Sequence, residues 1–68
     1  MAIESNVGKN IKKHRTKTGL SQEEFAQKSG VKYTTLTKIE SGVIKTPSVL
    51  ITAKIAKALG VSIEDLLK

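Results

Sequence analysis

The chain has 68 residues, a formal net charge of +6 and no cysteine. Its length allows one domain, residues 1–68, and excludes a large enclosed active site, while the lack of cysteine excludes a disulfide framework and a thiolate metal site. No apolar run resembles a signal peptide or is long enough to cross a bilayer, so we expect a cytoplasmic protein without a membrane partner.

Apolar spacing and capping residues predict five helices. The first covers about residues 6–18, with Val7 and Ile11 one turn apart. Gly8 lies inside this segment, where a small residue often marks close packing. The second covers residues 21–29, because Ser21-Gln22-Glu23-Glu24 has the pattern of a capping box. Gly30 follows it and can adopt a positive φ.

The third predicted helix covers residues 33–40 and ends at Gly42. The fourth has Thr46 as its N-cap and Pro47 as its first residue, where a missing N–H costs nothing. Its apolar positions repeat at helical spacing up to Gly60, and they are Leu50, Ala53, Ile55, Ala56 and Leu59. Ser62 caps a short fifth helix that carries Ile63, Leu66 and Leu67.

Residues 22–41 have the pattern of two short helices that cross steeply after a turn of three or four residues. Ala26 supplies the small side chain that such a crossing needs, and Gly30 supplies the turn. With Leu36 and Ile39 directed inward, the outer face of the later helix carries no acid, and it holds Lys32, Tyr33, Thr34, Thr37 and Lys38. Such a face suits a major groove, which admits one helix. The net positive charge is consistent with DNA binding. Taken alone, however, the charge is better explained by a solvated lysine-rich surface.

Two stretches resemble the phage repressor and Cro-like helix-turn-helix family, which is also called lambda-repressor-like or XRE-type. They are GLSQEEFAQKSGVKYTTLTKIESG, residues 19–42, and TPSVLITAKIAKALGVSIEDLL, residues 46–67. They combine at the family's spacings the Ser-Gln-Glu-Glu start, Ala26, Gly30, Glu40, Gly42, Pro47 and the ending Ala-Leu-Gly-Val. The resemblance implies an all-α, compact five-helix DNA-binding domain whose third helix reads bases. The chain departs from the family pattern at Lys32, where a capping Ser or Thr is usual, and at the bulky Tyr33.

The resemblance also implies which residues contact DNA. In this family the start of the third helix reads base edges, which assigns that role to Lys32, Tyr33, Thr34, Thr37 and Lys38. Phosphate contacts come from the first helix, the start of the second and the loop after the third, which assigns them to Lys12, Ser21, Gln22, Ser41, Lys45 and Ser48. Arg15 and Glu40 look like an internal ion pair with a structural role.

Nothing in the sequence supports catalysis, a cofactor or a metal. His14 is the single histidine, and a metal site would need partners that the chain does not offer near it. Ser21, Ser29 and Ser48 have no credible general base or acid, so no nucleophile is expected. We therefore expect a protein that is not an enzyme and that uses neither cofactor nor metal.

The predicted function is regulation of transcription at the nucleoid, by a homodimer that binds an inverted-repeat operator. One reading helix covers few base pairs, and two copies fit half-sites about 34 Å apart. The apolar residues 61–67 serve either a dimer contact or packing against the first and fourth helices. The alternative is a protein-interaction module, such as an antitoxin that neutralises a toxin. The outer face of the third helix carries no acid, which favours DNA. Regulation of transcription also implies polymerase as a possible protein partner.

Overall fold

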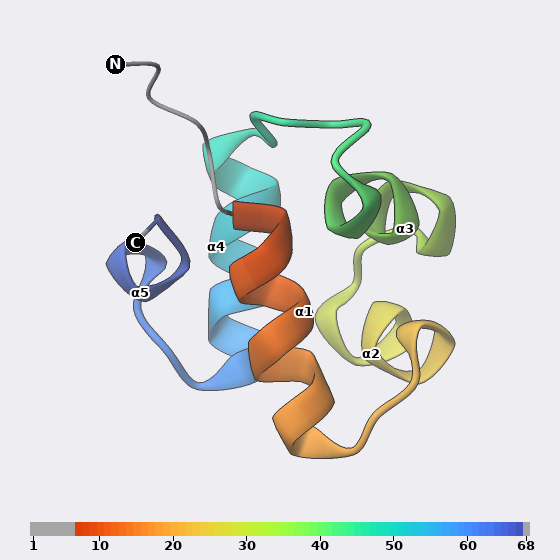
Figure 1. The fold of residues 1–68 in the computed structure, drawn as a ribbon. Coiled ribbons are helices and arrows are strands. Elements are labelled where there is room, and N and C mark those ends of the chain that lie inside the picture. The colour runs from red at the N-terminus through yellow and green to blue at the C-terminus, as the bar shows by residue number, and fades with distance from the viewer. Residues whose placement is uncertain (1–6, 68) are drawn as a thin grey trace.

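Five α-helices account for most of residues 7–67, which are the residues that the computed structural model describes (Figure 1). They are α1 (Val7–Thr18), α2 (Gln22–Ser29), α3 (Tyr33–Ser41), α4 (Val49–Leu59) and α5 (Ile63–Leu67). The predicted all-α, five-helix fold is confirmed over these residues, which contain no strand. The predicted start of the first helix at position 6 lies outside the described residues.

Each helix contributes to one central core. Six large side chains are fully buried there: Ile11, Phe25, Leu36, Ile39, Ile55 and Leu66. Burying a side chain of this size stabilises the fold by about 1.5–3 kcal/mol relative to leaving it exposed. A domain this small has few such residues, so the orientation of every helix depends on one or two of them.

Helices α1 and α3 approach each other at Gly8. A Cβ atom added to Gly8 would overlap the carbonyl oxygen of Ile39 and would lie 3.2 Å from the carbonyl carbon. The prediction that Gly8 marks close packing is confirmed. The two helices therefore meet backbone to backbone at this point, with no side chain between them.

The helix-turn-helix consists of α2, a turn at Gly30 and α3. The capping box is confirmed: the Ser21 hydroxyl accepts a hydrogen bond from the Glu24 amide at 3.1 Å, and the Glu24 carboxylate accepts one from the Ser21 amide at 3.0 Å. The hydrogen bond from the Ser21 amide lowers the pKa of Glu24 because it favours the ionised carboxylate. Gly30 has φ 76° and donates its amide to the Ala26 carbonyl. The positive φ ends α2 and turns the chain into α3.

The predicted start of α4 is wrong by two residues. Ser48, not Thr46, is the N-cap, and its hydroxyl accepts a hydrogen bond from the Ile51 amide at 3.2 Å. Pro47 therefore lies before the helix rather than at its first position. Hydroxyl residues stand on both sides of Pro47, so local pattern alone does not choose between them. The choice depends on the stretch after α3, which crosses the molecule before α4 can begin (Figure 1).

Leu50, one of the apolar positions that repeat at helical spacing in the predicted fourth helix, does not lie on the core face of α4. Leu50 is 68% exposed, whereas the buried residues of α4 are Thr52, Ile55 and Ala56. Leu50 lies two residues before Thr52, about 200° around the helix, and therefore on the opposite face. Thr52 is accommodated in the core because its hydroxyl donates to the Ser48 carbonyl at 2.9 Å.

Replacing Ser48 with alanine is expected to lower the free energy of unfolding by about 1 kcal/mol, because the Ile51 amide loses its capping acceptor. Thr46→Ala is the matched control and should change the free energy of unfolding by less than about 0.5 kcal/mol. Urea unfolding followed by circular dichroism measures both. A larger loss of unfolding free energy for Thr46→Ala than for Ser48→Ala would show that Thr46 is the N-cap, as the sequence predicts.

Helix α5 is tied to the rest of the domain at both ends. At its start, the Asp65 amide donates to the Ser62 hydroxyl at 3.1 Å and the Ser62 amide donates to the Asp65 carboxylate at 3.2 Å. At its end, Asn10 of α1 donates its side-chain amide to the Leu66 carbonyl at 2.8 Å. Packing inside the domain therefore accounts for Leu66, while Leu67 stays exposed.

Candidate nucleic-acid interface

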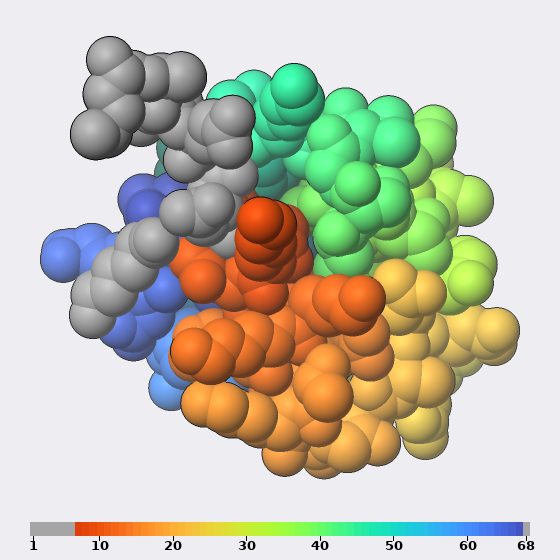
Figure 2. Space-filling view, in the orientation of Figure 1, coloured from red at the N-terminus to blue at the C-terminus, as the bar shows by residue number. Residues whose placement is uncertain are grey.

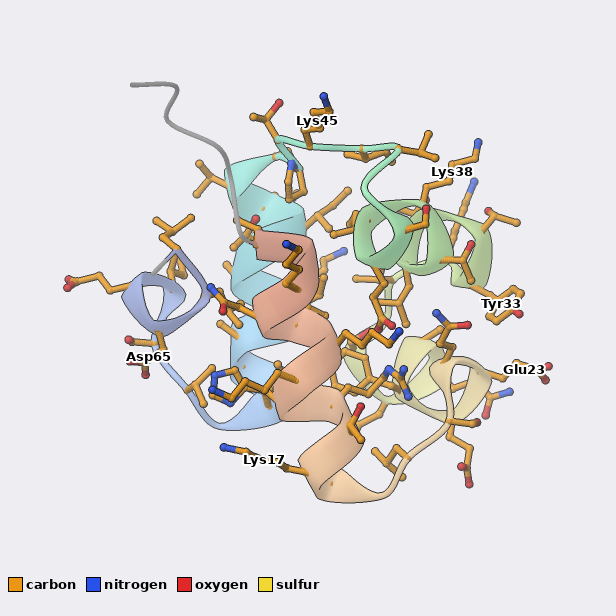
Figure 3. All side chains as sticks on the ribbon, in the orientation of Figure 1. Lys17, Glu23, Tyr33, Lys38, Lys45 and Asp65 are labelled. Carbon is orange, nitrogen blue, oxygen red and sulfur yellow. The ribbon has the colours of Figure 1, made fainter. Side chains whose placement is uncertain are left out.

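The outer face of α3 carries the residues predicted to read bases. Lys32, Tyr33, Thr34 and Lys38 are exposed, whereas Thr37 is half-buried. Tyr33 and Lys38 point away from the body of the domain (Figure 3). The opposite face of α3 holds Leu36 and Ile39, which are fully buried, so the helical period directs these polar side chains outward.

Thr34 and Thr37 differ in the hydrogen bonds that their hydroxyl groups can still form with DNA. Thr37 donates its hydroxyl proton to the Thr34 carbonyl at 2.8 Å. It therefore offers a methyl group and an acceptor, but no free proton, to a base. The Thr34 hydroxyl has no hydrogen-bond partner in residues 7–67, so it can donate as well as accept.

Helix α3 begins without a side-chain cap. Lys32 is its N-cap residue, with φ −60° and ψ 140°, and its side chain makes no capping hydrogen bond. A lysine has no acceptor atom, so it cannot satisfy the first amides of the helix. Its ammonium group is exposed at the N-terminal end of α3, beside the other residues predicted to read bases.

A salt bridge fixes α3 against α1. Arg15 donates from Nε to Glu40 Oε2 at 2.7 Å and from Nη2 to Oε1 at 3.0 Å, which is a bidentate arrangement. Its Nη1 donates to the Leu20 carbonyl at 2.7 Å. The hydrogen bond with Glu40 raises the pKa of Arg15. The side chains are only 12% and 2% exposed, so the pair is largely shielded from solvent.

Gln22 connects the start of α2 to the same network. Its side-chain amide donates to Glu40 Oε1 at 3.1 Å. One of its two amide protons is therefore engaged inside the domain, and the second remains for the predicted phosphate contact. This arrangement links α1, α2 and α3 through one carboxylate.

The other predicted phosphate contacts lie at three places. Lys12 is exposed on α1, and Lys45 is exposed on the loop between α3 and α4 (Figure 3). Ser21 and Ser48 accept capping hydrogen bonds, and each hydroxyl still has a proton to donate. Ser41 donates its proton to the Lys38 carbonyl at 3.2 Å, so its hydroxyl has only lone pairs left, which a phosphate oxygen cannot use.

Two residues that were not assigned to the interface lie beside it. Lys9 of α1 lines a small hollow with Ser41, Gly42 and Lys45, and Figure 2 shows the start of α1 next to the green loop after α3. The sequence shows Lys9 only as one of several lysines on one helix, so the approach of the loop could not be predicted from it. The loop is held there because the Ile44 amide donates to the Lys38 carbonyl at 3.0 Å.

The second residue is Glu23 of α2. It lines a hollow of about 470 Å³ together with Lys32 and Tyr33, and it lies on the same side of the molecule as Tyr33 in Figure 3. Helix α3 has no exposed acid of its own, but a carboxylate from the neighbouring helix flanks its first turn. Such a charge repels phosphate and can accept a hydrogen bond from the amino group of cytosine.

None of the helices in residues 7–67 is long and apolar enough to span a bilayer. Over the same residues, no three His, Cys, Asp or Glu side chains are grouped so that they could hold a metal ion.

Comparison with known sequences identifies relatives over most of the chain. A family model described as helix-turn-helix, HTH_3, matches residues 11–66. The HTH-type transcriptional regulator SinR of Bacillus subtilis is 36% identical over 61 residues, which are 90% of this chain and 55% of SinR. An uncharacterized HTH-type transcriptional regulator of Methanocaldococcus jannaschii is 43% identical over 56 residues, which are 82% of this chain and 83% of that protein. The chain thus spans about half the length of SinR.

Solved structures show the same fold at similar sequence identity. The crystal structure of SinR in complex with DNA superposes with a TM-score of 0.88 at 35% identity, covering 91% of this chain and 98% of that one. The restriction-modification controller protein C.AhdI from Aeromonas hydrophila gives a TM-score of 0.83 at 31% identity, covering 91% and 92%. The family model, the regulators and these structures agree with the predicted resemblance. The chain belongs to the HTH_3 helix-turn-helix family, of the lambda-repressor-like or XRE type.

Proposed function

We propose that the chain binds double-stranded DNA with sequence preference, places α3 in the major groove and regulates transcription in the cytoplasm, at the nucleoid. The observation that carries the proposal is the outer face of α3, where exposed donor groups stand on a helix anchored from behind by Leu36, Ile39 and the Arg15–Glu40 salt bridge. Support comes from SinR, whose structure was solved in complex with DNA.

Four of the five residues of the face have a specific chemical role in this proposal. Lys38 donates to O6 and N7 of guanine, which are acceptors in the major groove. Thr34 donates to a base acceptor, and the Thr37 methyl packs against the methyl group of thymine. Tyr33, which is 45% exposed, contacts a thymine methyl or a phosphate at the edge of the groove.

Replacing Lys38 with alanine is expected to cost about 1–3 kcal/mol of binding free energy at the preferred site and to relax the preference at one base pair. The site is first selected from random duplexes, and fluorescence anisotropy then measures binding to it and to single-base variants. Lys17, at the far end of α1 from Lys38 in Figure 3, provides the control variant Lys17→Ala. An equal loss of affinity on every sequence would contradict the role of Lys38 in base reading.

Replacing Lys45 with alanine is expected to weaken binding to all duplexes alike. Lys45 lies on the loop after α3 and, in the proposed complex, contacts a phosphate, so its removal should reduce the slope of log affinity against log salt by about one unit. Titrations at several salt concentrations measure the slope. A change confined to one sequence would instead make Lys45 a base-reading residue.

The proposal includes a homodimer on an inverted repeat. The domain exposes large apolar side chains outside α3, and these are Val43, Val49, Leu50 and Leu67. We infer that part of this apolar surface contacts a second copy, because one reading helix covers few base pairs and a second copy would supply the second. Selection from random duplexes tests this part too: a site with two-fold symmetry supports the dimer, and a single asymmetric half-site contradicts it.

A further inference from the structure

A groove between α2 and α4, which we call the α2–α4 groove, carries positive charge that, apart from Lys32, the proposed DNA reading does not use. It consists of two adjoining hollows of about 350 and 740 Å³ that share Lys54. Its rim is formed by Lys28, Lys32, Lys54 and Lys57. The apolar part of its lining, which we call the floor, is formed by Val31, Ile51, Ala58 and Leu59, and small polar residues and glycines complete the lining.

Among residues 7–67, the rim carries four ammonium groups and no carboxylate. No acidic residue lines either hollow, and none of the four lysines forms an ion pair within residues 7–67. Like charges around one groove repel each other, and an anionic ligand relieves that repulsion while gaining attraction of its own. The rim therefore selects for a negatively charged partner.

The floor selects for a partner that is also aliphatic and elongated. Ile51 and Ala58 are seven residues apart on α4, which corresponds to about 10 Å along the helix axis. Apolar side chains of a partner gain free energy when they are buried on such a floor. The groove has no aromatic side chain on which bases could stack, which disfavours single-stranded nucleic acid as its occupant. A duplex would also present a convex surface without aliphatic groups to the floor.

We propose that the α2–α4 groove binds an extended acidic segment of a partner protein. In an extended peptide, alternate side chains point to opposite sides, so aliphatic side chains can meet the floor while the carboxylates between them reach the lysines of the rim. The site is distinct from the base-reading face except at Lys32, which stands at the junction of the two. Because it concerns a different face, this inference does not depend on the proposed DNA binding.

The test uses the full chain and a labelled octapeptide of alternating glutamate and leucine, titrated by fluorescence anisotropy at low salt without DNA. The groove variant is Lys54→Glu with Lys57→Glu. The matched control is Lys13→Glu with Lys17→Glu, which makes the same change of charge on exposed positions of α1. We expect the groove variant to weaken peptide binding by about tenfold or more and the control variant to weaken it by about twofold or less.

Two further binding measurements identify the kind of molecule that the groove binds. An octaglutamate peptide should bind several times more weakly than the alternating peptide, since it cannot use the apolar floor. A labelled random duplex should lose no more affinity on the groove variant than on the control variant. Equal weakening of peptide binding by both variants, equal binding of both peptides, or a selective loss of duplex binding on the groove variant would each overturn the proposal. If circular dichroism shows that the glutamate variant is unfolded, Lys54→Ala with Lys57→Ala takes its place, with Lys13→Ala and Lys17→Ala as control.

Discussion

Replacing Glu40 with alanine is expected to lower the free energy of unfolding by about 3–5 kcal/mol. The Glu40 side chain is 2% exposed and accepts two hydrogen bonds from Arg15 and one from Gln22. Its removal leaves the Arg15 guanidinium, which is 12% exposed, with only the Leu20 carbonyl as partner. A chain of this size has a total stability of roughly 3–10 kcal/mol, so this change alone removes much of it.

Urea unfolding followed by circular dichroism measures the loss. Glu64, which is exposed on α5, gives the matched control Glu64→Ala, with an expected change within about 0.5 kcal/mol. The double variant Arg15→Met with Glu40→Leu should recover most of the stability, because an apolar pair leaves no charge buried without a partner. A loss below about 1 kcal/mol for Glu40→Ala would show that the pair behaves like a surface salt bridge.

Replacing Gly8 with valine is expected to cost about 1–3 kcal/mol or more of unfolding free energy. The added Cβ would overlap the Ile39 carbonyl oxygen, which is a backbone atom and cannot rotate away as a side chain can. That oxygen also accepts the Gly42 amide at 3.2 Å, so a shift of α3 would disturb the end of the helix as well. Since α3 must move relative to α1, we also expect weaker binding to the selected DNA site.

The control for this prediction is Lys13→Val, which places valine at an exposed position of the same helix. It reports the cost of a β-branched residue in α1 without the contact to α3. Gly8→Ala provides a second comparison, because alanine in an open helical position stabilises by about 0.5–1 kcal/mol relative to glycine. A gain of that size for Gly8→Ala would contradict the close approach of the two helices.

The fold could be predicted because its main signals are local. The capping box at Ser21, the glycines that end the helices and the spacing of Phe25, Leu36 and Ile39 each act within a few residues, and the structure agrees with them. The start of α4 could not be predicted in the same way. Thr46 and Ser48 can both cap a helix, and the choice depends on how far the preceding loop must travel.

The candidate site also combines features that could be predicted from the sequence with contacts that could not. The outward face of α3 follows from its helical period, so its five polar residues could be named from the sequence. The engagement of Gln22 with Glu40, the carboxylate of Glu23 beside Tyr33 and the approach of Lys9 to the loop after α3 each join residues that are distant in the chain. Such contacts depend on how helices pack, and one sequence does not reveal them.

The missing cap of α3 affects how the domain can adapt to its target. Only main-chain geometry closes the turn that begins at Lys32, whereas the later turns of α3 are anchored by Leu36, Ile39 and Glu40. Local opening costs least where few buried contacts must be broken. If α3 lies in the major groove as proposed, its first turn is therefore the part of the helix that readjusts at least cost to small differences in groove width.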